Sequence, residues 1–554
     1  LLSGIVSGND NCTLSTEKYV DLSLHFVPKA HYFSSTRTII MFSRLRTAST
    51  LGVGAFLVEI ETHLENALPA FIVVGLPDSA VKESRERVSA AIKNSHFIFP
   101  GKKITVNLAP ADIRKEGSAF DLPIAIGILK AIGIISTTLN LDKTLILGEL
   151  ALDGTLRPIH GALPIAVTAK NEQYERVILP EQNADEAAVV SGVEIIPVKS
   201  LRETVEYLNG DNAVKPRFID TATLFSRKET HLVDWSDVKG QENAKRALEV
   251  AAAGGHNAIM VGAPGSGKTM IAKRLATILP PLTLDEALET TKIHSVVGLL
   301  PEHEALITVR PFRAPHHTIS DAALVGGGVG VARPGEISLA HHGVLFMDEL
   351  PEFARNVLEV LRQPLEDRRI TISRTKQTIE YPANFMLVCS MNPCPCGNFG
   401  NPNHECSCTP QQIQKYMAKI SGPLLDRIDI HVDVTPVKYD ELSSARQGES
   451  SEQVRERVVR AREIQKRRFA RRKGVHKNAD MTAQDLRKYC ALDADGEKLM
   501  KQAMTVMGFS ARAFDRILKV ARTIADLADR DHILPQHVSE AIQYRSLDRQ
   551  YWNA

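Results

Sequence analysis

The residues best suited to chemistry form a glycine-rich segment, GAPGSGKT, at 262–269. It matches the pattern G-x-x-x-x-G-K-[ST] at every position, follows an apolar run at 258–261 and precedes a helical pattern at 270–279. Its members are Gly262, Ala263, Pro264, Gly265, Ser266, Gly267, Lys268 and Thr269. In such a loop, backbone N–H groups and the positive end of the helix attract phosphate. We therefore expect Lys268 to reach the β and γ phosphates of ATP and Thr269 to ligate Mg²⁺.

A second apolar run, VLFM at 344–347, ends in two acids, Asp348 and Glu349. Carboxylates at the tip of a buried strand need a partner, because burying an unpaired charge is costly, and Mg²⁺ would be that partner. Asp348 would then hold the metal through its water shell, and Glu349 would polarise the attacking water. The same pattern also marks an ordinary strand that leaves the core, so the nearby phosphate loop decides between the two interpretations.

Four of the seven cysteines crowd into one short stretch, as Cys394, Cys396, Cys406 and Cys408. Four thiolates can bind Zn²⁺ tetrahedrally, and so short a loop has few other ways to become ordered. The C-x-C spacing is less usual than C-x-x-C, and His404 could replace one ligand. The cluster can therefore be interpreted either as a structural zinc site or as four reduced thiols. The adjacent His316 and His317 are expected on opposite sides of a strand, which argues against a metal pair.

The phosphate loop and the two acids must be positioned by a fold that alternates strands and helices. Between 233 and 440, helical patterns separate apolar strands at 258–261, 343–347 and 385–390, which predicts an α/β fold with a parallel sheet covered by helices. The pattern from 441 to 554 is helical and predicts a lid that contains a basic segment. The core and the lid follow a connector, which we expect at 211–232.

The segment 41–210 predicts a smaller α+β domain. We expect its strands at 55–61, 70–74, 103–108 and 144–150, and its helices at 79–94 and 121–135. Residues 1–40 lack periodicity, so we expect a disordered or non-native leader with Met41 as the true start. A genuine but loosely packed N-terminal arm is equally consistent with this pattern.

Length and composition limit the class of protein. A chain of 554 residues is long enough for roughly three or four domains. The composition, 44% hydrophobic and 24% charged, excludes collagen-like, disulfide-stapled and wholly disordered classes. Seven cysteines are too few for a disulfide framework, which favours a reducing cytoplasm. No apolar run reaches the roughly 20 residues that a membrane-spanning helix needs.

The charge is unevenly distributed. A net charge of +2 alone argues against a dedicated nucleic-acid binder. However, residues 451–480 carry eleven Lys or Arg against four Asp or Glu. Such a segment can be a solvated helix face, but it also has the charge that a surface contacting a phosphate backbone requires. We therefore keep nucleic acid as an expected partner.

Three longer strings carry a family resemblance: GLPDSAVKESRERV at 75–88, RPFRAPHHTIS at 310–320 and SGPLLDRIDIHV at 421–432. Together with the phosphate loop, they resemble the ComM (YifB) family of magnesium-chelatase-like AAA+ ATPases, from Met41 to the C-terminus. The resemblance implies a homo-oligomeric ring, expected to be a hexamer, with ATP between neighbouring subunits. By the same resemblance, Asn392 would orient the water and Arg427 would reach the neighbour's γ-phosphate. Asn392 could also be an ordinary turn former, and Arg427 could pair with an adjacent aspartate.

Further site residues follow from this resemblance. Arg512 would be the second-sensor arginine, with Arg516 as the competing choice. Alternating residues around 374–377 predict a hairpin with a basic tip. In the resembled family, such a hairpin lines the ring pore, so Arg374 and Lys376 are candidates to bind single-stranded or branched DNA. A solvated hairpin tip is the alternative.

Residues 51–210 resemble the proteolytic domain of Lon. The stretch that corresponds to the Lon nucleophile reads KEGSAFD at 115–121, which places Ala119 at the nucleophile position, and the activator region 159–163 contains no lysine. We therefore expect a Lon-protease-like domain without the catalytic dyad, although Ser118 lies one position away.

The resemblance implies an ATP-dependent helicase that promotes branch migration of transforming DNA. A chelatase-like motor that remodels a protein partner and an ATP-dependent protease are the alternative functions.

Overall fold

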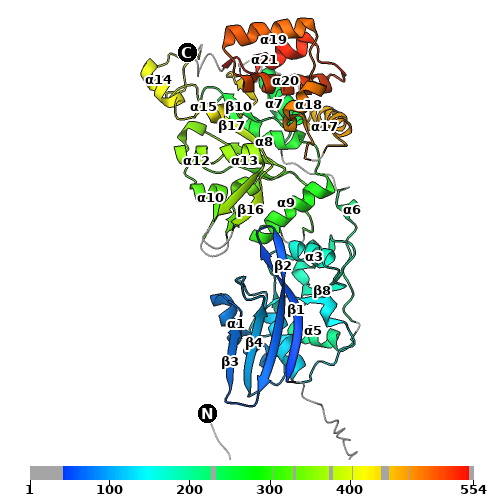
Figure 1. Ribbon diagram of the computed structural model, residues 1–554. Helices are drawn as coiled ribbons and strands as arrows, with labels where there is room; N and C mark the ends of the chain where they lie inside the picture. Colours follow the sequence, from blue (N-terminus) through cyan, green and yellow to red (C-terminus); the bar gives the residue numbers. More distant parts are fainter. Residues whose placement is uncertain are drawn as a thin grey trace, which may run out of the picture. The chain divides into compact units, whose positions relative to one another are not determined.

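The computed structural model describes most of the chain (Figure 1). The described residues are 41–115, 117–211, 213–225, 233–301, 304–328, 332–373, 378–401, 404–437, 448–472 and 474–547. The predicted leader at 1–40 and the predicted DNA contacts Arg374 and Lys376 lie outside them.

A mixed seven-stranded sheet organises the N-terminal part, in the order β3-β4-β2-β1-β5-β8-β9. Its strands are β1 Phe42–Leu51, β2 Gly54–Glu65, β3 Ala70–Val74, β4 Lys103–Ala109, β5 Thr144–Ile146, β8 Arg176–Pro180 and β9 Glu194–Val198. Its helices are α1 Ser79–Asn94, α2 Asp121–Ala131, α3 Ala162–Asn171, α4 Glu181–Ala188 and α5 Leu201–Leu208. A short antiparallel pair, β6 Glu149–Leu150 and β7 Leu156–Arg157, lies outside this sheet.

The helix α2 is apolar nearly all round, because it is enclosed by β1, β2, α1 and α5. Two sequence predictions were too long here. The predicted helix 121–135 ends at Ala131, because the chain turns at Gly133 (φ +77°). The predicted strand 144–150 divides into β5 and β6.

A parallel five-stranded sheet, β11-β14-β17-β10-β18, forms the second core. Its strands are β10 Ala258–Val261, β11 Phe312–Arg313, β14 Val344–Met347, β17 Met386–Met391 and β18 Ile430–Asp433. Every residue of β10, β14 and β17 is buried, as expected for a parallel sheet covered on both faces. Since parallel strands end at one edge, the phosphate loop after β10, Asp348 after β14 and Asn392 after β17 meet there.

Helices surround this sheet. The longer ones are α7 Glu242–Gly254, α8 Lys268–Ile278 and α9 Leu284–Val297. The shorter ones are α10 Asp321–Val325, α11 Glu336–Leu339, α12 Arg355–Glu359, α13 Arg362–Asp367, α14 Pro410–Met417 and α15 Gly422–Leu425. Helix α6, Thr221–Phe225, lies in the predicted connector and packs on a separate small cluster. The predicted hairpin is confirmed as antiparallel β15 Arg369–Ser373 and β16 Thr378–Pro382. A second small pair joins β12 Gly326–Gly327 to β13 Arg333–Pro334.

The C-terminal part is helical, as predicted (Figure 1, orange to red). It comprises α17 Ser451–Arg468, α18 Ala483–Tyr489, α19 Ala494–Met507, α20 Ala511–Leu527 and α21 Pro535–Gln543. Apolar residues of α17 and α20 share one core with α7, α8 and the face of the parallel sheet. None of the described helices is both long enough and apolar enough to span a membrane.

Candidate nucleotide site

The phosphate loop connects β10 to α8, as the sequence predicts. Gly262 opens the loop where the chain passes close to the end of β18, and a Cβ atom there would lie 2.3 Å from the Val434 carbonyl oxygen. Only glycine fits so close an approach. At the other end, Lys268 is the first residue of α8, so its backbone adds to the N-terminal field of that helix.

Lys268 is almost fully buried and contacts neutral oxygens. Its Nζ donates to the carbonyl oxygens of Gly262 (2.7 Å) and Ala263 (2.9 Å) and to Oδ1 of Asn392 (3.2 Å). Burial lowers its pKa. Among the described residues, the partners of this ammonium are neutral oxygens rather than carboxylates, and the buried Ser266 Oγ has no hydrogen-bond partner. A buried cation and an unsatisfied hydroxyl in a glycine-rich loop fit a phosphate group.

Asp348 binds two hydroxyl groups at the same edge of the sheet. Its Oδ2 accepts a hydrogen bond from Thr269 Oγ1 (2.6 Å), and its Oδ1 accepts one from Ser390 Oγ. The structure thus brings together both residues that we expected at the magnesium ion. A carboxylate and a hydroxyl are oxygen ligands of the kind Mg²⁺ prefers. The sequence interpretation missed Ser390, which is the penultimate residue of the buried strand β17 and belongs to no motif.

Glu349 follows in a left-handed conformation (φ +53°), and its side chain is 58% exposed. Its Oε2 lies 3.7 Å from Nδ1 of His317. The prediction that His316 and His317 point to opposite sides of a strand was wrong. They lie in a turn outside any strand, and their ring centroids are 4.1 Å apart. His317 therefore contacts Glu349, the acid expected to polarise water. The sequence spacing did not indicate this contact.

Three arginines meet in a cavity of about 140 Å³ that contains no residue of the phosphate loop. Arg427 and Arg512 both line it, together with Arg516. Arg427 pairs with Glu366 rather than with an adjacent aspartate, and its buried Nε has no hydrogen-bond partner. Burial lowers the pKa of Arg427; Glu366 opposes this effect, and neighbouring guanidinium groups add to it. The lining also contains Lys519 and the carboxylates Asp426 and Asp515, so the cavity combines positive and negative side chains.

Arg512 and Arg516 differ in their surroundings. Arg516 pairs with Asp429, whose side chain is only 1% exposed. Burial raises the pKa of Asp429, but Arg516 and His256 outweigh burial and hold it well below its usual range. Arg512 is 64% exposed and lies 3.9 Å from Asp426. Arg516 is thus engaged inside the protein, and Arg512 is the one available to a ligand.

The four clustered cysteines converge. Sγ of Cys394 lies 3.3 Å from Sγ of Cys396 and 3.6 Å from Sγ of Cys406, and all four sulfurs lie within 4.8 Å of one another. The backbone N–H of Asn398 contributes most to lowering the pKa of the Cys396 thiol, to about 5. His404 is not part of this sulfur group. The donor set fits a soft tetrahedral ion such as Zn²⁺.

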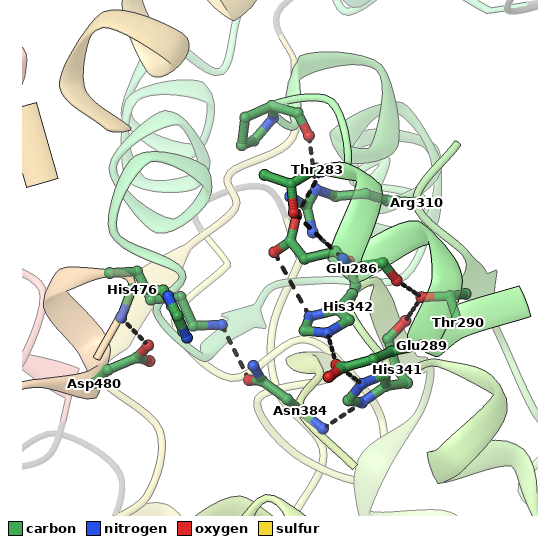
Figure 2. A network of polar contacts seen from close by, with 12 residues as sticks. Thr283, Glu286, Glu289, Thr290, Arg310, His341, His342, Asn384, His476 and Asp480 are labelled. Carbon is green, nitrogen blue, oxygen red and sulfur yellow. Dashed lines mark hydrogen bonds and ion pairs between the residues drawn. The ribbon is translucent and has the colours of Figure 1, made fainter. Parts of the chain in front are cut away.

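A second group of potential metal ligands, Glu289, His341 and His342, lies near the beginning of β14 (Figure 2). Glu289 Oε2 lies between Nε2 of His341 (3.2 Å) and Nε2 of His342 (2.8 Å). Nδ1 of His341 accepts the backbone N–H of Asn384, so the proton of the neutral ring is on Nε2. Burial lowers the pKa of His341 to about 4 and keeps the ring neutral. His341 thus donates to Glu289 and offers no lone pair to a metal.

Comparison with known proteins shows the family to which the chain belongs. The family model "Magnesium chelatase, subunit ChlI" matches residues 234–442, "Subunit ChlI of Mg-chelatase" matches 60–183, and the ChlI C-terminal model matches 448–545. Competence protein ComM of Haemophilus influenzae is 45% identical over 515 residues, which cover 92% of this chain and 98% of that protein. The chain belongs to the ComM (YifB) family.

Two other relatives refine this assignment. The uncharacterized protein YifB of Escherichia coli is 44% identical over 510 residues, which cover 92% of this chain and 97% of that protein. Lon protease 2 of Bacillus subtilis is 30% identical over 146 residues, or 26% of each chain. The predicted family and the α/β fold class, with an AAA+ core, a Lon-like part and C-terminal helices, are therefore confirmed.

In this ComM-family chain, the Lon-like part is apolar at the expected nucleophile position. Ala119 packs against a buried cluster that includes Ile159 and Leu163 from the predicted activator region. Ser118 donates to Glu149 instead of contacting a lysine, and Lys115 donates to the Pro110 carbonyl oxygen. These contacts do not resemble a serine–lysine dyad.

The basic segment is largely satisfied inside the protein. Several of its arginines bind carboxylates or carbonyls from other segments. These arginines are Arg455, Arg457, Arg462, Arg468 and Arg472. The interpretation of the whole segment as a phosphate-contacting surface was therefore too broad. Arg460, Lys466, Arg467 and Arg471 are its exposed cations among the described residues.

Proposed function

We propose that this ComM-family chain hydrolyses Mg-ATP in a ring of identical subunits, expected to be a hexamer, and uses the reaction to move DNA. The observation that carries the proposal is the convergence of Lys268 with Asn392, and of Thr269 with Asp348, at one edge of the parallel sheet. Bound Mg-ATP would supply the phosphoryl group to be cleaved. Lys268 and the loop would bind its phosphates, and Thr269 and Asp348 would hold its metal.

The remaining roles concern water and charge. We assign Glu349 to polarise the attacking water and Asn392 to orient it. The arginine cavity contains no residue of the phosphate loop, which supports a role for Arg427 and Arg512 toward the nucleotide of a neighbouring subunit. This division would explain why a ring is required, since each site would need residues from two copies.

DNA is the proposed substrate of this motion. The name of the Haemophilus relative, a competence protein, supports a role in natural transformation and recombination, and branch migration is the form of DNA movement that we propose. Arg374 and Lys376 are the proposed DNA contacts. The proposed location is the cytoplasm, where thiols stay reduced.

A chelatase-like motor acting on a protein is the second candidate function. The magnesium-chelatase 38 kDa subunit of Rhodobacter capsulatus, 27% identical over 177 residues, favours it. Proteolysis has less support, because Ala119 stands at the expected nucleophile position and Ser118 donates to Glu149 rather than contacting a lysine. Zn²⁺ is the ion that we propose for the four-cysteine group.

Mixing two inactive variants tests the shared site. Lys268→Ala disables the subunit's own phosphate loop, and Arg427→Ala removes the residue offered to a neighbour. Each variant alone should lose hydrolysis. In a random mixture, about a quarter of the sites pair an intact loop with an intact arginine, so activity should return to about that fraction. A mixture as inactive as its components would contradict the shared site.

A further inference from the structure

The four-cysteine loop, residues 394–408, lies directly against the phosphate loop. It begins two residues after Asn392, which contacts Lys268. In its middle, Gly397 (φ +82°) packs on Pro264, and a Cβ atom at 397 would lie 2.4 Å from Cδ of Pro264. The loop therefore contacts the phosphate loop at Pro264, and its first cysteine lies two residues after the asparagine that contacts Lys268.

A cavity of about 410 Å³ lies between the phosphate loop and the cysteine loop. Ala263 and Pro264 line it from the phosphate loop, and Cys396, Asn398 and His404 line it from the cysteine loop. Pro264 thus packs against the cysteine loop. The described residues of 393–409 form no helix or strand. Such a segment needs another source of order.

The positions of the four sulfur atoms fit a bound zinc ion, which would order the loop. Tetrahedral zinc with bonds of about 2.3 Å would separate its sulfur ligands by about 3.8 Å. The closest sulfur pairs lie at 3.3 to 3.6 Å, near that value and far beyond a disulfide bond of about 2.05 Å. Backbone N–H groups of Phe399 and Cys396 point at Sγ of Cys394 (3.3 Å) and Cys408 (3.4 Å). These donors would help to stabilise negative charge on thiolates.

We propose that one Zn²⁺ bound by Cys394, Cys396, Cys406 and Cys408 holds the cysteine loop against Pro264, so that ATP binding depends on the bound zinc. The inference rests on the proposed nucleotide function, since it concerns the same phosphate loop. Loss of the ion would release the contact at Gly397 and the neighbouring segment that carries Asn392. The phosphate loop would then lose its support on this side.

Two glycines of the loop form a matched pair for the test. Gly397 (φ +82°) and Gly400 (φ +75°) share a left-handed conformation, so alanine strains the backbone similarly at both. Only at 397 would the new methyl group meet Pro264, because nothing lies within 4 Å of a Cβ atom at 400. Gly397→Ala should weaken ATP binding about tenfold, whereas Gly400→Ala should not.

The experiment measures zinc content and the affinity for a fluorescent ATP analogue with excess Mg²⁺ on the full chain. We expect one zinc ion per chain, an affinity about tenfold weaker after zinc removal, and recovery on adding Zn²⁺ back. Zinc removal needs no substitution, so it remains decisive if a variant fails to fold. Equal ATP affinity with and without zinc, or equal effects of Gly397→Ala and Gly400→Ala on that affinity, would overturn this inference but not the proposed nucleotide function. Failure of the untreated chain to bind the analogue would instead refute the proposed function.

Discussion

Two arginines four residues apart on α20 allow a sharp separation of activity from stability. Arg516 forms an ion pair with Asp429, a carboxylate that is 1% exposed. Arg512 is 64% exposed, and its nearest carboxylate oxygen, on Asp426, is 3.9 Å away. If Arg512 is the second sensor, replacing each arginine by alanine should affect different properties.

The magnitudes follow from burial. Arg516→Ala leaves the Asp429 charge buried with fewer partners, and breaking such a pair costs about 3 kcal/mol or more. For a folding unit of 150–250 residues, 3 kcal/mol lowers Tm by roughly 6 to 12 °C. An exposed pair such as Arg512 with Asp426 contributes about 0 to 1 kcal/mol. Arg512→Ala should therefore change Tm by less than roughly 4 °C.

Calorimetry and ATP turnover, measured on the same preparations, test this separation. Arg512→Ala should lower kcat roughly hundredfold or more, because a guanidinium would no longer stabilise charge on the neighbour's phosphates. Measurements of Arg516→Ala should be made well below its Tm, where the chain remains folded. A fully active Arg512→Ala protein, or an Arg516→Ala protein with unchanged Tm, would refute the reasoning.

The remaining predictions concern four other parts of the molecule. Glu349→Gln should slow hydrolysis at least hundredfold in a steady-state assay while nucleotide affinity stays within about twofold, because the carboxylate acts on water; undiminished turnover would exclude the role. His317→Ala should lower kcat roughly tenfold with unchanged affinity, because it removes the contact that positions Glu349; unchanged kcat would contradict this. Replacing both Arg374 and Lys376 by alanine should weaken DNA binding and reduce the slope of log affinity against log salt, by about 1 per lost contact, while basal hydrolysis remains. Equal loss of both activities would count against the pore assignment. Casein should not be degraded by the untreated chain, and Ser118→Ala should change nothing; degradation abolished by that substitution would restore the protease hypothesis.

The sequence predicted which residues meet at the edge of the parallel sheet, because each of them follows a short local motif. The phosphate loop, Asp348 and Asn392 each follow a short buried strand, and parallel strands bring their ends together. The strand β11 was not predicted, since its two residues, Phe312 and Arg313, are too few to show a period.

Contacts between distant segments were beyond prediction. The partner of Glu349 is His317, 32 residues earlier, in a turn whose path depends on tertiary packing. The basic segment illustrates the same limit, because Asp526 and Asp485 bind two of its arginines and lie outside the segment that was counted. A local charge count does not include these partners.

The most direct test of the proposed DNA motor is ATP hydrolysis by the purified full chain, with and without single-stranded and forked DNA. The account predicts that both DNAs stimulate hydrolysis, that the forked substrate is unwound, and that DNA affinity falls steeply as salt rises. Hydrolysis that is indifferent to DNA, with no salt-sensitive DNA binding, would contradict it.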